Sequence, residues 1–254
     1  MITSTANARI KDVIQLQKKS RYRKEKSLYI VEGIKMFAEA DKSFMEAVYV
    51  TEDFLNSPKA DELLSGVEYE IVSDNVMKAM SDTVTPQGVL CIMKRFEYSL
   101  SSILNKKKPR LMLLADLQDP GNAGTIIRSA EGAGMDAVIF SKGSVDLYNP
   151  KTIRSTMGSM FRVPFIYEDL DVVISKLKEM KVPVYTTDMN GQSYKEVSYE
   201  DGFAIIIGNE ANGVSKEISA LADKVITIPM SGKVESLNAS IAASLIMFEA
   251  CYKL

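Results

Sequence analysis

The chain has 254 residues and a formal net charge of −2, and 46% of its residues are apolar and 25% charged, as in ordinary globular proteins. It has no histidine and two cysteines, Cys91 and Cys251. These counts exclude histidine-based catalytic triads, histidine-ligated metals and a disulfide framework, so we expect no metal. The sequence has no 18-residue apolar run and no signal-peptide pattern, which predicts a cytoplasmic protein without a membrane partner.

Positive charge is concentrated in two tracts of an otherwise acidic chain. Residues 1–30 have a net charge of +6 and residues 94–110 one of +5, against −13 for the remainder. Segregated cations of this kind indicate contact with a polyanion such as RNA. A disordered basic arm and a solvated linker are the alternative that charge alone leaves open. The candidate RNA-binding residues of the first tract are Arg9, Lys11, Lys18, Lys19, Arg21, Arg23 and Lys24.

The N-terminal part predicts a small α/β domain, because short apolar runs alternate with segments of helical spacing. Strands are expected at 28–31, 47–50, 69–72 and 89–93, and helices at 34–40, 59–64 and 74–80. A charged stretch then separates two apolar strands, which is typical of a linker. We therefore expect a domain at 1–95, a basic linker at 96–109 and a second domain at 110–254. Leu100, Ile103 and Leu104 have helical spacing, so a surface helix is the alternative to a linker.

The second domain alternates strands and helices more clearly, and several strands are apolar throughout. This pattern predicts a mainly parallel sheet covered by helices on both faces. The expected strands are 111–115, 137–140, 163–167, 182–186, 204–207 and 225–228, and the expected helices are 123–133, 151–161, 170–180, 216–222 and 239–252.

Three segments lie where strands of this sheet should end, at 119–128, 207–214 and 228–240. The carboxyl ends of parallel strands share one edge, where ligands bind. Asn122 is a plausible N-cap of the helix that follows the first segment, and Arg128 comes six residues later. Ser236 or Asn238 can likewise be explained as the N-cap of the last helix, without any functional role. The sequence contains neither a Gly-x-Gly-x-x-Gly fingerprint nor a P-loop.

Taken together, the three segments resemble the motifs of the SpoU branch, or TrmH family, of the knotted SPOUT-type RNA methyltransferases. Residues 122–128 are similar to that family's Asn-x-x-x-x-x-Arg motif, and 208–213 to its Gly-Asn-Glu-x-x-Gly motif. Residues 228–242 are similar to its Ile-Pro-Met and Ser-Leu-Asn-x-Ser-x-Ala motif. Residues 7–33 are similar to the start of the RNA substrate-binding domain of ribosomal-RNA members, which itself resembles small ribosomal RNA-binding proteins.

The resemblance implies an α/β fold with a trefoil knot, a homodimer, and transfer of a methyl group from S-adenosylmethionine to a ribose 2′-hydroxyl. The domain type favours 23S ribosomal RNA over transfer RNA. The implied catalytic residues are Asn122, Arg128, Glu210, Ser236 and Asn238. The implied cofactor-binding residues are Thr187, Gly208, Asn209, Ile228, Met230, Leu237 and Ala239.

The resemblance implies that Arg128 is the catalytic arginine of the family, which is usually assigned as the general base. A guanidinium with a pKa above ~12 is a poor general base. We expect Arg128 instead to fix the adjacent phosphate and stabilise the developing alkoxide. A base role assisted by that phosphate is the alternative. Arg154 extends the expected RNA surface, unless it only flanks the core.

Other functions remain open at this point. The alternatives are a non-catalytic RNA-binding or ribosome-assembly factor of the same fold, a transfer-RNA 2′-O-methyltransferase, and an enzyme acting on a small nucleotide. The complete set of Asn122, Arg128, Glu210 and Asn238 favours catalysis. The basic N-terminal domain favours RNA over a small nucleotide.

Overall fold

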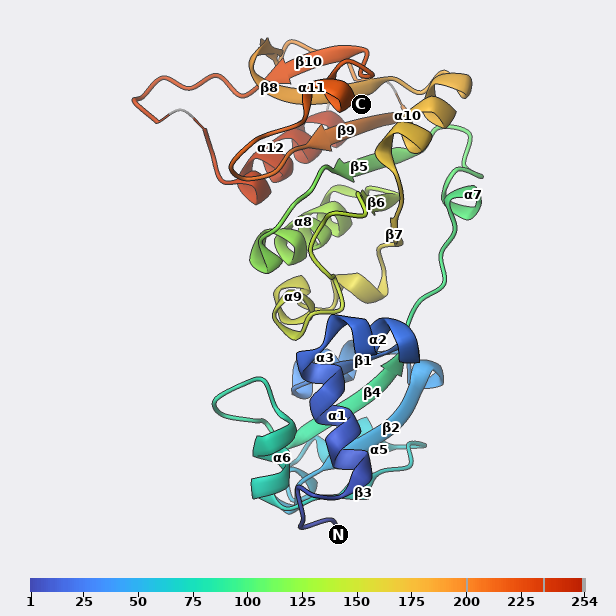
Figure 1. The fold of residues 1–254 in the computed structure, drawn as a ribbon, viewed down its shortest axis with the longest axis vertical. Coiled ribbons are helices and arrows are strands. Elements are labelled where there is room, and N and C mark those ends of the chain that lie inside the picture. Colours follow the sequence, from blue (N-terminus) through green and yellow to red (C-terminus); the bar gives the residue numbers. More distant parts are fainter. Residues whose placement is uncertain (200, 235, 253–254) are drawn as a thin grey trace. The chain divides into compact units, whose positions relative to one another are not determined.

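The computed structural model describes residues 1–199, 201–234 and 236–252, which form two compact units (Figure 1). Unit 1 comprises Met1–Glu97 together with Asp146–Phe161, and unit 2 comprises the described residues of Tyr98–Val145 and Arg162–Leu254. The boundaries expected from the sequence placed residues 146–161 in the second domain, whereas their contacts place them in unit 1.

Unit 1 contains a four-stranded mixed sheet in the order β1-β4-β2-β3, in which only β2 and β3 are parallel. The strands are β1 (Leu28–Glu32), β2 (Met45–Val50), β3 (Glu70–Ile71) and β4 (Val89–Lys94). The helices are α1 (Ala8–Lys18), α2 (Ser20–Lys26), α3 (Ile34–Glu39), α4 (Glu52–Leu55), α5 (Ala60–Leu64), α6 (Asp74–Met80) and α9 (Pro150–Thr156), with short 3-10 turns at Lys42–Phe44 and Ser159–Phe161.

The basic N-terminal tract is folded into α1 and α2, so the alternative of a disordered arm is wrong. The Asn7 side chain caps α1 by accepting a hydrogen bond from the Arg9 N–H at 2.9 Å. Ile10, Val13 and Leu16 are spaced to lie on one face of α1, and all three are buried in the core of unit 1. Their burial holds the helix, while the intervening basic side chains face solvent.

Unit 2 is built on a six-stranded parallel sheet in the order β10-β8-β9-β5-β6-β7, as the alternation of strands and helices predicted. The strands are β5 (Arg110–Leu114), β6 (Ala137–Phe140), β7 (Phe165–Tyr167), β8 (Val184–Ser193), β9 (Phe203–Ile207) and β10 (Lys224–Thr227). The helices are α7 (Leu100–Ile103), α8 (Pro120–Ala133), α10 (Leu170–Glu179), α11 (Lys216–Ser219) and α12 (Ala239–Tyr252).

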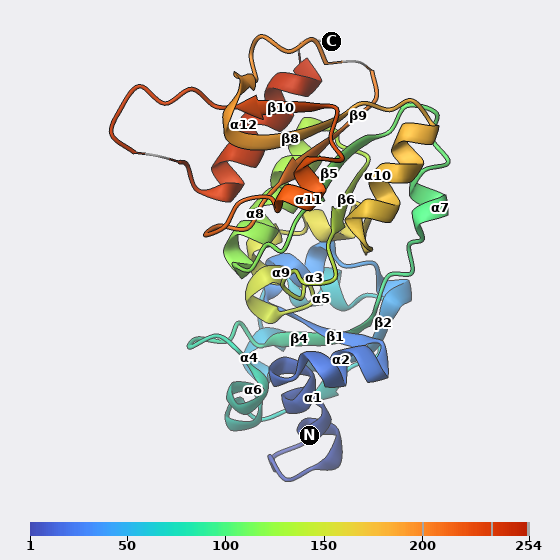
Figure 2. The same cartoon turned by 45° about the horizontal axis from the view of Figure 1, so that its top comes forward.

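Helices cover both faces of this sheet, with α8 and α12 packed together on one side and α7 and α10 on the other (Figures 1 and 2). Helix α7 lies within the basic tract at 96–109. Leu100 and Ile103 of α7 are buried in the core of unit 2, as their helical spacing indicated. The tract therefore includes a packed helix, and is not a solvated linker throughout.

One expected helix is interrupted. The spacing predicted a helix over 151–161, but α9 ends at Thr156 because Met157 and Gly158 adopt positive φ angles of 53° and 97°. None of the helices in the described residues is long and apolar enough to cross a membrane. The described residues also contain no cluster of three His, Cys, Asp or Glu side chains able to hold a metal ion.

Candidate functional site

Three chain segments meet at the carboxyl edge of the parallel sheet in unit 2. Glu210 follows β9, Asn122 lies in the first turn of α8 after β5, and Asn238 follows β10. The Asn122 Nδ2 donates to Glu210 Oε1 at 3.0 Å, and the Asn238 Nδ2 donates to Asn122 Oδ1 at 2.9 Å. One side chain from each predicted motif thus belongs to a single chain of hydrogen bonds.

Glu210 is the final acceptor in this series of hydrogen bonds. Its carboxylate also accepts hydrogen bonds from the backbone N–H groups of Asp119 at 3.0 Å and Gln118 at 3.2 Å. Partial desolvation alone would raise the pKa of Glu210, but the Asn122 amide and the backbone donors outweigh it and lower that pKa below its usual value. Because a carboxylate only accepts, Asn122 must turn its NH₂ group toward Glu210 and its oxygen toward Asn238.

The caps of two helices hold this geometry. Asp119 caps α8, with its Oδ1 accepting from the Asn122 N–H at 2.7 Å, and Pro120 occupies the first helical position. The prediction that Asn122 is the cap is therefore wrong. The helix starts earlier than expected, which leaves the Asn122 side chain available to Glu210. Asn238 does cap α12, since its Oδ1 accepts from the Ser240 N–H at 2.9 Å, and it also donates to Asn122.

Arg128 lies elsewhere on α8. Six residues on a helix of 3.6 residues per turn place it on a different side from Asn122. Its side chain is exposed, and it forms no hydrogen bond or ion pair with any described residue. Ser236 is also exposed and has no polar partner in the described part of the chain, and Glu235 beside it lies outside that part. The structure therefore does not bring Arg128 or Ser236 into contact with the Asn122–Glu210–Asn238 chain.

The loop after β9 is built on close backbone packing. A Cβ added to Gly208 would lie 2.1 Å from the carbonyl carbon of Gly213, so only glycine fits at this position. The Asn209 Oδ1 accepts from the Ala211 N–H at 2.9 Å, and its Nδ2 donates to the Asp116 carbonyl at 2.8 Å. Asn209 thereby ties the end of β9 to the end of β5.

The remaining candidate cofactor residues surround this edge. The Thr187 hydroxyl donates to the Ile206 carbonyl at 2.9 Å, and Ala239 begins α12. Ile228, Met230 and Leu237 lie between β10 and α12. Within the described residues, 228–234 and 236–237 form no backbone hydrogen bonds. The backbone N–H and C=O groups of this segment are therefore open to water or to a ligand.

The candidate RNA-binding residues differ in availability. Lys11, Lys18, Lys19 and Lys24 are exposed and form no ion pair with the described residues. Arg9 pairs with Glu70, and the Arg21 Nε lies 2.8 Å from Glu25 Oε1 in an exposed pair that contributes little stability.

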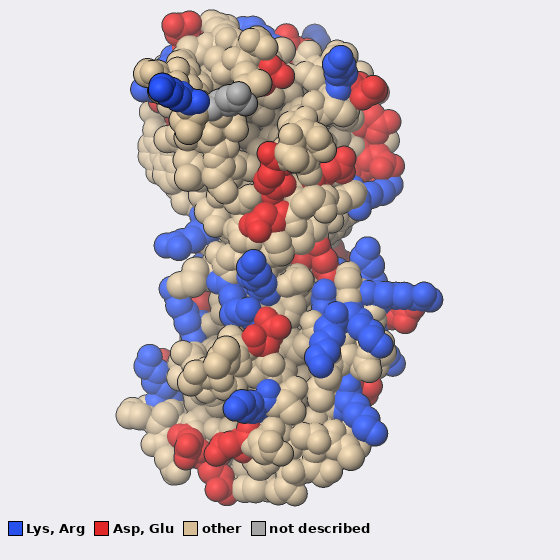
Figure 3. Space-filling model, turned by 60° about the vertical axis from the view of Figure 1, so that its left-hand side comes forward, with Lys and Arg blue, Asp and Glu red and all other residues tan. Residues whose placement is uncertain are grey.

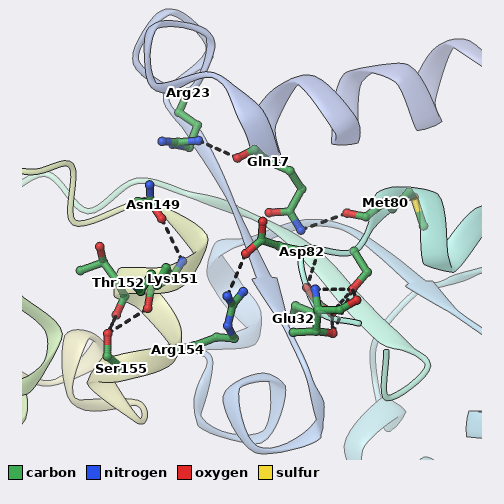
Figure 4. Close-up of polar contacts among 12 residues, drawn as sticks. Gln17, Arg23, Glu32, Met80, Asp82, Asn149, Lys151, Thr152, Arg154 and Ser155 are labelled. Atoms are coloured by element: carbon green, nitrogen blue, oxygen red, sulfur yellow. Dashed lines mark hydrogen bonds and ion pairs between the residues drawn. The ribbon is translucent and has the colours of Figure 1, made fainter. Parts of the chain in front are cut away.

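Arg23 is not available to RNA, so that prediction is wrong. It is 2% exposed, and its guanidinium donates to Asp146 Oδ2 and to the Leu16 carbonyl, each at 2.7 Å. Arg154, on α9 of unit 1, is partly exposed and donates from Nη2 to Asp82 Oδ2 at 2.8 Å (Figure 4).

Sequence reasoning missed Asp116 and the role of Asp119. Asp116 lies two residues after β5 and has a φ of 53°, unusual for a residue with a side chain. Its Oδ1 accepts from the Ser141 hydroxyl at 2.7 Å, and its carbonyl receives the Asn209 amide. The position of Asp119 directly before a proline was a usable capping signal. No sequence signal indicated Asp116.

Two family models together match most of the chain. Residues 109–248 match the model of the SpoU rRNA Methylase family, and residues 7–91 match the MRM3-like substrate binding domain. The chain is 32% identical over 250 residues to the 23S rRNA (guanosine(2553)-2′-O)-methyltransferase RlmP of Bacillus subtilis, with 97% of each chain covered.

Two solved structures of similar chains carry S-adenosylmethionine, abbreviated AdoMet. An AdoMet-bound rRNA methyltransferase from Sinorhizobium meliloti has a TM-score of 0.89 at 27% identity, covering 100% of this chain and 97% of that one. The SpoU methyltransferase AviRb from Streptomyces viridochromogenes, in complex with AdoMet, has a TM-score of 0.88 at 25% identity, with coverage of 97% and 98%. The chain belongs to the SpoU rRNA methylase family.

Proposed function

We propose that this protein methylates the ribose 2′-hydroxyl of a guanosine in 23S ribosomal RNA. The observation that carries the proposal is the hydrogen-bonded chain of Glu210, Asn122 and Asn238, which joins three separate motifs at one edge of the sheet. The choice of a 23S guanosine is supported by the likeness to RlmP, a 23S rRNA (guanosine(2553)-2′-O)-methyltransferase that the chain matches over 97% of its length. A cytoplasmic location is part of the proposal and is supported by the likeness to the bacterial enzyme RlmP.

S-Adenosylmethionine supplies an activated methyl group on its sulfonium when bound, so the protein needs no metal to activate the donor. The residues of the chain must hold the donor and present the acceptor. The unpaired backbone groups of Ile228, Met230 and Leu237 are suited to bind the donor's polar edges. Gly208 allows the backbone of Gly213 and Val214 to approach closely in the loop after β9.

Arg128 is proposed to act on the acceptor side. Its guanidinium stays protonated, presents several N–H donors and has no partner among the described residues. It is therefore available to hold an RNA phosphate and to stabilise the negative charge that develops on the 2′-oxygen. We propose that Asn122 and Asn238, held by the Glu210 carboxylate, orient the incoming ribose, and that Ser236 supports the same loop.

The exposed face of α12 supports a homodimer. Leu245 and Phe248 are 41% and 40% exposed, and Tyr252 stacks on Phe248 with ring centroids 5.7 Å apart. Together with Tyr194 and Lys195 these side chains line a groove of about 600 Å³. An apolar helix face beside a groove suits association with a second copy. We also propose the trefoil knot of the family for the C-terminal segment of unit 2.

The direct test is transfer of a labelled methyl group from S-adenosylmethionine to protein-free 23S ribosomal RNA. Methylation of a ribose 2′-oxygen protects the following phosphodiester, so we expect the label in an alkali-resistant dinucleotide containing guanosine. Label on a base, or in transfer RNA alone, would contradict the proposal. Tight binding of the donor and of 23S RNA without any transfer would favour an RNA-binding assembly factor.

A further inference from the structure

Residues 146–161 are part of unit 1, although the segments before and after them in the sequence belong to unit 2. They follow β6 and precede β7, and they carry α9. Their contacts nevertheless group with Met1–Glu97. A segment inserted between two strands of the parallel sheet therefore contributes to the surface of unit 1.

A buried ion pair fastens the start of this segment to unit 1. The Arg23 Nε and Nη2 donate to Asp146 Oδ2 at 3.0 and 2.7 Å, and its Nη1 donates to the Leu16 carbonyl at 2.7 Å. The Arg23 Nη1 also donates to the Gln17 carbonyl at 3.1 Å (Figure 4). The Ser20 hydroxyl also donates to Asp146 Oδ2 at 2.8 Å. The side chains of Arg23 and Asp146 are 3% and 12% exposed. Removing one partner of such a pair is costly, because the other charge stays buried.

A second contact fastens α9 itself. The Arg154 Nη2 donates to Asp82, and the backbone N–H of Asp82 donates at 3.0 Å to the buried carboxylate of Glu32 (Figure 4). The Thr83 hydroxyl donates to the same carboxylate at 2.5 Å. The loop that receives Arg154 is therefore held to β1, and the position of α9 is fixed at two points.

These two contacts lie among cations that remain available. Lys18 and Lys19 immediately precede Ser20, and both are exposed. Lys151 on α9 is exposed and forms no ion pair with the described residues. The Arg154 side chain is 33% exposed, although its Nη1 is buried. Lys and Arg side chains gather on the face of unit 1 drawn in Figure 3. Phosphate backbones are bound by such groups.

We propose that α9 supplies Lys151 and Arg154 to a phosphate-binding surface that also includes Lys18 and Lys19, and that Arg23 and Asp146 are positioning residues for it. This inference rests on the proposed function, because it takes the ligand to be the sugar–phosphate backbone of ribosomal RNA. Arg23 touches no RNA in this arrangement. It acts by holding the segment that does.

The test measures equilibrium binding of the full-length protein to protein-free 23S RNA at several salt concentrations. Lys151→Gln and Arg154→Gln should each weaken binding several-fold and reduce the slope of log K against log salt by about one. Lys178→Gln, which removes an exposed lysine on α10 of unit 2, is the matched control and should bind as wild type. Wild-type affinity and slope in both α9 variants would overturn the proposal.

A double-mutant cycle tests the positioning role. Asp146→Asn should weaken RNA binding in the wild-type background and leave the affinity for S-adenosylmethionine unchanged. In the Lys151→Gln/Arg154→Gln background it should cost little further affinity, because the contacts that it positions are already gone. Additive losses would overturn the positioning role. If Asp146→Asn does not fold, Arg23→Lys replaces it in the cycle. This variant keeps the positive charge but loses the paired hydrogen bonds from Nε and Nη2 to Asp146.

Failure of the proposed function gives a different result. If the wild-type protein binds no 23S RNA and transfers no methyl group to it, both the function and this inference are wrong. If the wild type binds and methylates 23S RNA while the α9 variants match it, only the inference is wrong.

Discussion

The two units place their functional groups by different means. In unit 2, Asn122, Glu210 and Asn238 are held by hydrogen bonds to one another and to backbone groups at strand ends. In unit 1, the proposed RNA-binding groups are exposed cations on or beside helices, and packing alone separates the exposed Lys19 from the buried Arg23. A hydrogen-bonded site at a sheet edge is thus tied to short sequence motifs, whereas a basic surface depends on contacts between distant segments.

The largest effect is expected from Arg128→Ala in unit 2. Loss of a group that stabilises developing charge should lower kcat by about 10²–10³-fold, while the affinity for S-adenosylmethionine stays near wild type. Arg162→Ala is the control, because Arg162 is an exposed arginine of the same unit that pairs with Glu131. Single-turnover methyl transfer with saturating RNA measures the change. Near-normal turnover of the Arg128 variant would remove Arg128 from the reaction.

A smaller effect is expected from Glu210→Gln. Its carboxylate accepts from Asn122 and from the N–H groups of Asp119 and Gln118, and a glutamine would turn an N–H group toward some of these donors. Hydrogen bonds to a charged group contribute about 1.5–3 kcal/mol, so kcat/KM should fall by about 10- to 150-fold. Glu217→Gln, at an exposed carboxylate of unit 2, should behave as wild type. Equal rates for the two variants would show that the hydrogen-bonded chain is not needed.

Gly208→Ala tests whether the site depends on close backbone packing. The added Cβ would overlap the backbone of Gly213 and Val214, so we expect a loss of about 1–3 kcal/mol in the free energy of unfolding and weaker donor binding. Gly213→Ala is the matched comparison, because a Cβ there meets no atom within 4 Å and only its φ of 67° is unfavourable. Thermal unfolding and calorimetric binding measure both. A smaller loss at Gly208 than at Gly213 would contradict the packing argument.

The smallest effect concerns pH. The pKa of Glu210 is lowered in the folded protein, so its stabilising contribution is complete above the ordinary glutamate pKa of about 4.3 and is lost only as the pH falls through the lowered value. Stability from pH 5 to 8 should therefore be unaffected by this group. Comparing denaturant unfolding of wild type and Glu210→Gln across acidic pH measures the contribution. A difference that disappears already at pH 6 would contradict the lowered pKa.

The sequence predicted much of unit 2 for a physical reason. Strands buried on both faces have to be apolar, and parallel strands bring their carboxyl ends together, so Asn122, Glu210 and Asn238 were expected near one edge. Their individual contacts were not predictable. Whether Asp119 or Asn122 caps α8 depends on the residue at which the helix begins. The contacts of Asp116 depend on its positive φ angle, which no residue type in the sequence indicated.

Unit 1 was less predictable, because its surface depends on long-range packing. Arg23 and Lys24 are adjacent basic residues, and only the meeting of α2 with Asp146, more than 120 residues away, buries one and leaves the other exposed. The same contact joins the segment that contains α9 to unit 1, although β6 and β7 flank this segment in the sequence. No local sequence pattern indicates a contact between residues so far apart.

The measurement that tests the central claim most directly is methyl transfer to 23S RNA in which the target guanosine alone lacks its 2′-hydroxyl. The target is first located by its alkali-resistant linkage, and the modified RNA is then assembled from synthetic fragments. We predict that binding of this RNA is retained and that transfer to it is abolished, since the site orients a 2′-oxygen for attack on the methyl group. Continued transfer to the deoxy-substituted RNA would contradict ribose methylation at this site.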